Sequence, residues 1–201
     1  MLPATPPSSS DPALASYDSP IGRLTLAARG GALVGLWAAG QRFFGARQGV
    51  GEAEAGSSPD VTEPARRAAR VASAGWDRED AEVVCATARW LDGYFAGLRP
   101  SPDPIPIEAA GTAFQMRVWE AMDSIPYGAT RTYGQIVAQL HEAGVPASAQ
   151  AVGGAVGRNP LLLIRPCHRV VAATGRGGYA AGTQAKAWLL AHEAATASSV
   201  S

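Results

Sequence analysis

The sequence has little charge, and its charges cancel. Only 17% of the 201 residues are charged, and 17 basic side chains balance 17 acidic ones, so the formal net charge is zero. Chains that bind nucleic acids are usually strongly basic, so any such contact here must come from a local patch. Hydrophobic residues make up 47% of the chain, which is normal for a globular protein that buries a core.

Metal ligands and membrane-spanning segments are also lacking. The two cysteines, Cys85 and Cys167, and the three histidines form no CxxC pair and no zinc-ligand spacing, so we expect neither a metal nor another cofactor. The first residues lack the basic and apolar regions of a signal peptide, and no stretch has the length of a membrane span. We therefore expect a cytoplasmic protein, in a reducing compartment where a free thiol survives. Its abundance of alanine, glycine, proline and arginine points to a bacterial source.

Composition along the chain predicts an α+β protein with two folded domains. Residues 1–12 are rich in proline and serine and too poor in apolar side chains to order, so we expect a disordered tail. Residues 13–98 are expected to form a first domain of strands and helices. The prolines of residues 99–110 predict a stiff, extended linker. Residues 111–197 are expected to form a mostly helical second domain.

Local patterns in the first domain predict its elements. Over residues 17–37 apolar positions alternate around glycine and proline, which is typical of a hairpin or meander of short strands. Residues 47–64 are rich in glycine, serine and glutamate without apolar periodicity, and are predicted to be a surface loop. Apolar residues recur at helical spacing over residues 80–98. Cys85 lies in this predicted helix, matches no motif, and is expected to be a core residue.

The second domain contains three helices with recognisable starts. Two threonines precede a glutamine by three residues, the spacing of a capping box: Thr112 with Gln115 and Thr132 with Gln135. Ser148 can cap a third helix over residues 149–157, whose small side chains suggest close approach of another surface. Two short helices joined by a Gly/Pro turn form the outline of a helix-turn-helix, whose second helix can enter a DNA groove. Many proteins with this outline never touch DNA, so spacing alone leaves DNA binding open.

A short apolar run immediately precedes the residues that are best suited to catalysis. Residues 161–164 predict a buried strand that ends just before Cys167 and His168. A thiolate is a nucleophile, and an adjacent histidine, a helix N-terminus, or the flanking Arg165 and Arg169 can lower the pKa of the thiol. Neighbouring residues on a strand point to opposite faces, so His168 must act through a local turn. These residues alone leave both a catalytic and a merely buried cysteine open.

The run Pro166-Cys167-His168-Arg169-Val170 resembles the active-site signature of the methylated-DNA–protein-cysteine methyltransferases, which repair O6-alkylguanine. Other segments follow the pattern of this family in order: Gly111-Thr112-Ala113-Phe114-Gln115, Val118-Trp119, Ile125-Pro126-Tyr127-Gly128, Thr132-Tyr133-Gly134, Ala151-Val152-Gly153, Gly157-Arg158-Asn159-Pro160, Gly178-Tyr179 and Trp188-Leu189-Leu190-Ala191-His192-Glu193. Residues 17–22 resemble the start of the family's N-terminal domain. The resemblance implies a ribonuclease H-like N-terminal domain and a C-terminal domain with a winged-helix-like helix-turn-helix and the active site.

The resemblance also implies a mechanism. An alkyl group on O6 of guanine, or on O4 of thymine, would pass to Cys167 in one irreversible turnover. His168 would activate the thiol through a water and would itself be oriented by Glu193. The damaged base would be flipped out of the duplex. Tyr179 would donate a hydrogen bond to a guanine ring nitrogen, and Asn159 corresponds to the hinge between recognition helix and active site.

The same resemblance implies contacts with double-stranded DNA by a monomer, through the minor groove, where small side chains fit. Tyr133 would displace the 3′ phosphate of the flipped nucleotide, and Lys186 would organise the binding loop. The DNA-binding residues expected on this basis are Thr132, Tyr133, Gln150, Ala151, Gly153, Arg158 and Arg169. The residues expected to form the substrate pocket are Pro166, Val170, Ala180 and Lys186. Within residues 127–190 basic residues outnumber acidic ones, which favours a basic face.

The chain departs from the family pattern at a few positions, and two other functions remain open. Gln150 replaces the arginine that usually fills the gap left by the flipped base, so we expect weaker DNA binding or slower capture. The stretch of residues 172–183 is one residue short and less rich in glycine, which leaves the size of the alkyl pocket open. One alternative is a lesion-binding protein of the alkyltransferase-like type, although such proteins lack the acceptor cysteine. The other is a cysteine hydrolase that uses Cys167, His168 and Glu193.

Overall fold

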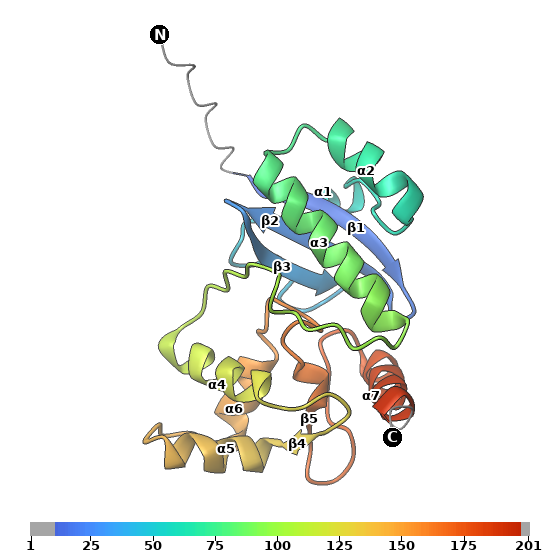
Figure 1. Cartoon of the computed structure of the whole chain (residues 1–201). Coiled ribbons are helices and arrows are strands. Elements are labelled where there is room, and N and C mark those ends of the chain that lie inside the picture. Colours follow the sequence, from blue (N-terminus) through green and yellow to red (C-terminus); the bar gives the residue numbers. More distant parts are fainter. Residues whose placement is uncertain (1–10, 198–201) are drawn as a thin grey trace.

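A computed structural model describes residues 11–197 of the chain. The expected disordered tail, residues 1–12, lies outside the described residues except for its last two positions. The fold is α+β, as predicted: a three-stranded antiparallel sheet covered by helices occupies one end of the molecule, and shorter helices around two two-residue strands occupy the other (Figure 1).

The predicted meander is present as strands β1 (Ala13–Ser19), β2 (Gly22–Arg29) and β3 (Ala32–Ala38), paired in that order. Gly22 turns the chain between the first two strands at a φ of 101°, a conformation that side chains other than glycine rarely adopt. Side chains on both faces of the sheet are buried. Leu24, Leu26 and Leu36 belong to the main core, whereas Trp37 packs with Val34 and Ala27 in a separate cluster.

Helix α3 (Arg78–Phe95) lies across the sheet, close to its predicted bounds, and α2 (Pro64–Ser73) packs beside it (Figure 1). The prediction of a surface loop over residues 47–64 is partly wrong. This segment contains the short helix α1 (Glu52–Gly56) and buries Val50, Ala55 and Val61. The backbone N–H of Val61 donates to the carbonyl of Ser16 at 2.8 Å, so the end of the segment is held against β1.

The proline-rich segment at residues 99–110 is anchored to the sheet. Leu33 N–H donates to the carbonyl of Pro106 at 2.8 Å, and Glu108 N–H donates to the carbonyl of Leu33 at 3.0 Å. The segment therefore satisfies backbone groups at the outer edge of β3. It also lies between the sheet and the helices that follow (Figure 1).

The C-terminal part contains α4 (Ala113–Asp123), α5 (Tyr133–Glu142), α6 (Ala149–Val156) and α7 (Thr183–Ala197). Both predicted capping boxes are formed, and the hydroxyl of Ser148 caps α6 by accepting from Ala151 N–H. Strands β4 (Arg131–Thr132) and β5 (Val170–Val171) pair in parallel. The turn of 3₁₀ helix η1 (Cys167–Arg169) immediately precedes β5.

The prediction of a strand at residues 161–164 is wrong, although its prediction of burial is confirmed. All four side chains are buried, but the chain makes a tight turn in which Arg165 N–H donates to the carbonyl of Leu161 at 2.9 Å. Leu163 takes a positive φ of 68° to close this turn. A run of apolar residues indicates that the segment is buried but does not determine its backbone conformation. The pattern is therefore compatible with a strand and with a tight turn.

Candidate active site

Cys167 is the first residue of η1, and its side chain is 3% exposed. The amide nitrogen Nδ2 of Asn159 donates to its Sγ at 3.2 Å. The same Nδ2 also donates to the carbonyls of Leu161 and Arg165, at 3.2 and 2.9 Å, and the Asn159 side-chain oxygen accepts from Leu161 N–H. One buried amide therefore ties the preceding turn to the thiol.

The environment of Cys167 favours the protonated thiol. Burial raises the pKa of Cys167 to about 11, and neither the hydrogen bond from Asn159 nor the nearby charge of Lys186 offsets that effect. Arg165 and Arg169, which the sequence offered among several groups able to lower the pKa of the thiol, are not among the groups that shift it in the structure. Arg165 lies over Trp119, and Arg169 is turned toward α7. The thiol needs a base to become a nucleophile.

His168 is completely buried beside the thiol-bearing residue, and its Nε2 lies 2.7 Å from Oε1 of Glu193. This contact places a proton on Nε2 and leaves Nδ1 as the acceptor nitrogen. Burial lowers the pKa of His168 despite the attraction of Glu193, so the neutral imidazole is favoured. Nδ1 has no hydrogen-bond partner within residues 11–197. The ring is therefore fixed at one end and able to accept a proton at the other.

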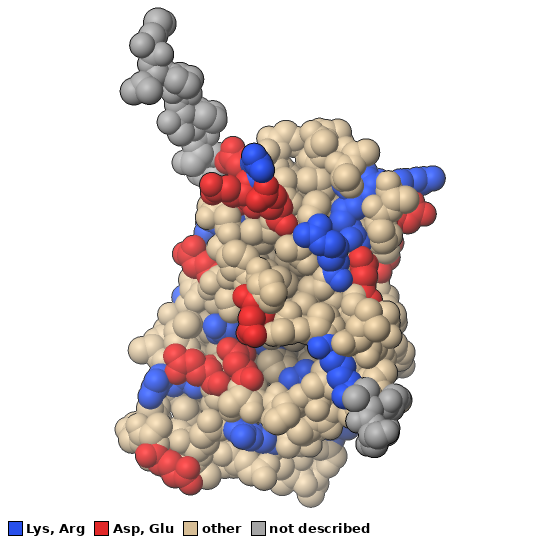
Figure 2. All heavy atoms as spheres, in the orientation of Figure 1, with Lys and Arg blue, Asp and Glu red and all other residues tan. Residues whose placement is uncertain are grey.

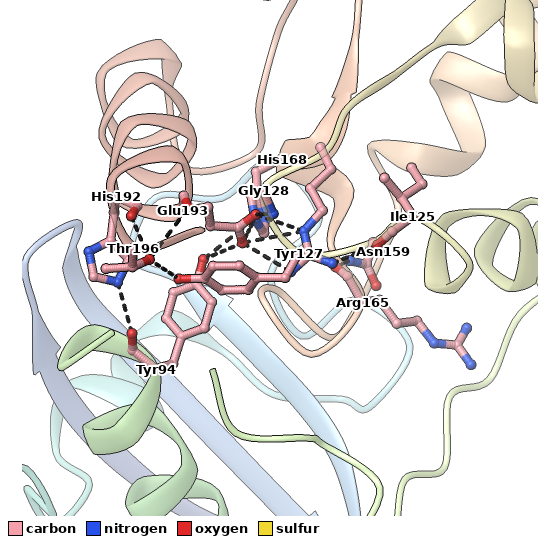
Figure 3. A network of polar contacts seen from close by, with 11 residues as sticks. Tyr94, Ile125, Tyr127, Gly128, Asn159, Arg165, His168, His192, Glu193 and Thr196 are labelled. Carbon is pink, nitrogen blue, oxygen red and sulfur yellow. Dashed lines mark hydrogen bonds and ion pairs between the residues drawn. The ribbon is translucent and has the colours of Figure 1, made fainter. Parts of the chain in front are cut away.

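Glu193 on α7 is the centre of a network formed by three parts of the chain (Figure 3). It is 1% exposed and accepts hydrogen bonds from the Tyr94 hydroxyl at 2.8 Å and from Gly128 N–H at 3.0 Å. Arg169 donates from Nε and Nη2 at 2.9 and 3.0 Å, and its Nη1 donates to the carbonyl of Ile125. Burial raises the pKa of Glu193, but the hydrogen bonds and charges of His168 and then of Arg169 hold it well below its usual range.

Lys186 organises the loop that follows β5. Its side chain is completely buried, and Nζ donates to the carbonyls of Val170 and Gly178 at 2.6 and 3.0 Å. This joins the strand after η1 to the segment that carries Tyr179, so it holds that tyrosine near Cys167. Burial lowers the pKa of Lys186.

A cavity of about 340 Å³ opens onto Cys167. Its size lies in the range of small-ligand sites, roughly 300–1,000 Å³. Its lining combines α6, the loop after β5 and the segment after β3: Arg42, Phe43, Tyr133, Gly153, Gly154, Val156, Gly157, Arg158, Cys167, Gly178, Tyr179 and Ala180. Glycines form the α6 wall, which leaves room for a planar ligand beside the thiol.

Comparisons with known proteins match this chain to one family. The model for the 6-O-methylguanine DNA methyltransferase DNA-binding domain matches residues 113–195. A methylated-DNA–protein-cysteine methyltransferase of Mycobacterium leprae is 39% identical over 87% of this chain and 88% of its own length. The chain belongs to the methylated-DNA–protein-cysteine methyltransferase family.

Further comparisons support this family assignment. The protein of that name from Salmonella typhimurium is 43% identical over 59% of this chain and 68% of its own length. The crystal structure of Mycobacterium tuberculosis OGT in complex with DNA superposes with a TM-score of 0.67 and 34% identity, covering 91% of this chain and 93% of that one. The chain is thus a DNA-repair enzyme that transfers a methyl group from DNA to a protein cysteine. No helix in the described part is long and apolar enough to cross a membrane.

The structure brings most of the predicted methyltransferase site together. Cys167, Tyr133, Gly153, Arg158, Tyr179 and Ala180 line the thiol cavity, and Asn159, His168 and Glu193 lie behind it. Gln150 and Ala151 are exposed at the start of α6, whereas the Thr132 hydroxyl accepts from Gln135 N–H as the cap of α5. Pro166, Val170 and Lys186 were expected in the pocket but do not line it.

Two expectations need revision: that Arg169 contacts DNA, and that residues 127–190 present a basic face. All three guanidinium nitrogens of Arg169 bond to Glu193 or to the Ile125 carbonyl, so the side chain supports the active site from within. Arg165 and Lys186 are buried as well. Acidic and basic side chains are mixed on the face drawn in Figure 2. The excess of basic residues at 127–190 therefore overstates the charge available at the surface.

Sequence reasoning missed three residues of the site. Tyr94 looks like one more apolar position on a helix, yet its hydroxyl reaches Glu193. Arg42 and Phe43 follow β3 in a segment without a motif, and they line the thiol cavity, where Arg158 stacks over Phe43 at 4.6 Å. Only the tertiary fold brings these residues to the cysteine, so no local signal marks them.

Proposed function

We propose that this chain repairs O6-alkylguanine in DNA by moving the alkyl group to Sγ of Cys167 in a single turnover. The observation that carries this proposal is a buried cysteine in a cavity, backed by a histidine that a buried carboxylate orients. A bond forms between Sγ and the alkyl carbon while the bond from that carbon to O6 breaks. The stable thioether that results has no means of regeneration within the described residues, which makes the reaction stoichiometric.

Proton transfer in this reaction begins at His168. Its neutral ring accepts the thiol proton at Nδ1, directly or through one water, and the Nε2 proton strengthens its bond to Glu193 as the ring becomes charged. The departing guanine takes electrons onto O6 and its ring. The Tyr179 hydroxyl, which is buried beside Cys167 and makes no well-formed hydrogen bond within residues 11–197, is available to donate to that base. A matched donor at the leaving group stabilises the transition state.

The target base must leave the duplex to reach the thiol, because the cavity is enclosed by α6 and the loop after β5.

We infer that α5 and α6 act as a helix-turn-helix in a winged-helix-like domain, beside an N-terminal domain of ribonuclease H-like fold. The small exposed residues at the start of α6 suit the narrow minor groove. Tyr133 and Arg158, at the mouth of the cavity, would contact the backbone of the flipped nucleotide. O4-alkylthymine would transfer its alkyl group by the same chemistry. One monomer would be sufficient to bind the DNA and carry out the transfer.

The proposal is tested by incubating the full chain with duplex DNA containing O6-methylguanine and weighing the protein. We expect each molecule to gain one methyl group in place of one hydrogen, confined to the peptide with Cys167, and Cys167→Ala to gain nothing. An unmodified protein that binds the lesion tightly would instead be a damage sensor. Repeated turnover without an adduct would make it a hydrolase. Either result contradicts transfer to Cys167.

Gln150 lies at the exposed start of α6, where a side chain can enter the gap that a flipped base leaves. Glutamine can hydrogen-bond the orphaned cytosine but brings no charge to the phosphates. We expect Gln150→Arg to speed transfer from duplex DNA about threefold to tenfold, by the order of one added phosphate contact. Equal rates for both proteins at limiting concentration would contradict this role.

A further inference from the structure

A second and larger cavity, of about 550 Å³, lies beside the active-site turn. It is formed by the proline-rich segment that begins at Arg99, by the end of α3 and by the residues that precede Cys167. Arg165 and Pro166 line it, but it shares no lining residue with the thiol cavity. Tyr94 and Arg169 of the Glu193 network also line it, but no step of the proposed transfer reaction takes place in it.

Two arginines at this cavity lack hydrogen-bond acceptors. Arg165 is 7% exposed, and its Nε and Nη1 are buried without a hydrogen-bond partner among residues 11–197. Nε and Nη2 of Arg99 are in the same condition. Figure 3 shows the side chain of Arg165 directed away from the network around Glu193. Guanidinium groups present five donors in a fixed plane, and buried donors without acceptors destabilise a fold.

The acidic side chains of the cavity do not satisfy these donors. Asp123 forms an ion pair with Arg165, but its carboxylate lies 3.6 Å from Nε, beyond hydrogen-bond distance, and burial raises the pKa of Asp123 to about 6 although the charge of Arg165 opposes that effect. Asp103 lies at the exposed rim, where its carboxylate accepts from the Ser101 hydroxyl. The interior therefore presents cationic donors that an anionic group can pair with.

The remaining walls are apolar and aromatic. Arg99 lies over the ring of Tyr127, with 5.5 Å between the guanidinium carbon and the ring centroid. Trp90, Tyr94 and Ile107 also line the cavity. Aromatic rings and guanidinium planes are the surfaces on which nucleobases stack. A volume of about 550 Å³ exceeds what a lone inorganic anion would fill and lies within the range for small-molecule sites.

We propose that this cavity binds an aromatic phosphate monoester of the size of a nucleoside monophosphate, with its phosphate on Arg99 and Arg165 and its base on the aromatic wall. Arginine pairs with phosphate through two parallel hydrogen bonds, which would satisfy the unpartnered nitrogens. The ligand has two possible sources that share this chemistry, a free nucleotide and the 5′-phosphorylated end of a DNA strand.

Occupancy of the cavity would act on the reactive turn. The carbonyl of Arg165 accepts from Cys167 N–H at 2.8 Å and from Asn159 Nδ2 at 2.9 Å. A ligand that fixes the side chain of Arg165 therefore restrains the backbone that positions the thiol. This consequence is separate from the proposed repair function, because binding can be measured without any DNA lesion.

The test is a calorimetric titration of the full chain with adenosine 5′-monophosphate, with adenosine as the neutral comparison. We expect one site per chain, and binding of adenosine weaker by about tenfold or more, as for the loss of a charge-assisted hydrogen bond. Arg99→Asn should weaken nucleotide binding by a similar factor. Asparagine tolerates the positive φ of 52° at this position, so the backbone is retained. Ile107 is 41% exposed at the cavity, so Ile107→Trp places a larger side chain at its rim without a change in charge and should also weaken binding.

The matched control is Arg158→Gln, which removes the same charge at the thiol cavity and should bind the nucleotide like the wild type. Equal affinity for adenosine and its monophosphate would overturn the proposal. Loss of binding in Arg158→Gln with retention in Arg99→Asn and Ile107→Trp would overturn it too, since the nucleotide would then occupy the thiol cavity. A 5′-phosphorylated oligonucleotide separates the sources. Binding that depends on Arg99 and on the 5′ phosphate identifies a strand end, and binding of the mononucleotide alone identifies a free nucleotide.

Discussion

Cys167 and Glu193 are both almost completely buried close to His168, yet their surroundings shift their pKa values in opposite directions. The thiol is 3% exposed and receives one side-chain hydrogen bond, from Asn159. The carboxylate is 1% exposed and receives hydrogen bonds from Tyr94, Gly128, His168 and Arg169. Burial raises the pKa of either group, but hydrogen bonds from His168 and Arg169, together with their positive charge, outweigh that effect at Glu193, whereas burial prevails at Cys167.

This difference assigns separate tasks to the two sides of the ring. The carboxylate side is saturated with donors and fixes the base in one orientation. The thiol side supplies fewer hydrogen bonds, and burial favours the protonated form of Cys167.

Glu193→Gln should break the carboxylate side. The substitution leaves Arg169 buried without its counter-charge, so we expect the free energy of unfolding to fall by about 3–5 kcal/mol. Transfer to Cys167 should slow at least a hundredfold, by the order known for a mispositioned base. Urea denaturation and the mass of the alkylated protein measure the two effects. Glu120→Gln, at a surface ion pair, is the control and should change stability by less than about 1 kcal/mol.

The pH dependence of thiol modification tests the other side. In a Cys85→Ser background, the rate of reaction of Cys167 with iodoacetamide should keep rising above pH 9, because its pKa is about 11. A plateau near pH 9 would contradict a thiol disfavoured by burial.

The same raised pKa makes folding stability depend on pH. Protonated Cys167 is favoured in the folded state, so its contribution is complete below the ordinary thiol pKa of 9 and is lost as the pH rises to about 11. At about 1.4 kcal/mol per pKa unit, the two units amount to about 3 kcal/mol. The difference in unfolding free energy between wild type and Cys167→Ala should therefore shift by up to this amount between pH 8 and 11. A constant difference over that range would contradict the shift.

Tyr94→Phe removes one donor from the carboxylate side and leaves the rest. A hydrogen bond to a charged group contributes about 1.5–3 kcal/mol, so we expect a loss of stability in that range and a transfer rate lower by about threefold to tenfold. Tyr127→Phe is the control, since the Tyr127 hydroxyl is paired with the neutral Thr196 hydroxyl. If both variants transfer at the wild-type rate, Tyr94 has only a structural role.

The features of this site that depend on residues close together in the sequence could be predicted, and those that depend on packing between distant segments could not. The capping boxes at Thr112 and Thr132 depend on residues three apart, so the helices they start were correctly placed. The family motifs located Cys167 and its partners. Tyr94 lies 74 positions from His168 in the sequence, and no local pattern signals that its hydroxyl enters the network. The inward direction of Arg169 and the positive φ of Leu163 depend equally on packing between distant segments.

Tyr179→Phe gives the smallest expected change in stability and the sharpest comparison with Tyr94. The Tyr179 hydroxyl is buried beside Cys167 and makes no well-formed hydrogen bond in the described part of the chain, only a weak contact with the Cys167 thiol, so its removal should leave the free energy of unfolding within about 1 kcal/mol of wild type. Transfer should still slow, because that hydroxyl is the donor proposed for the departing guanine. A loss of stability equal to that of Tyr94→Phe would mean that the hydroxyl has a structural partner. Stability retained with slower transfer would mean that the thiol side keeps an unsatisfied donor for its substrate.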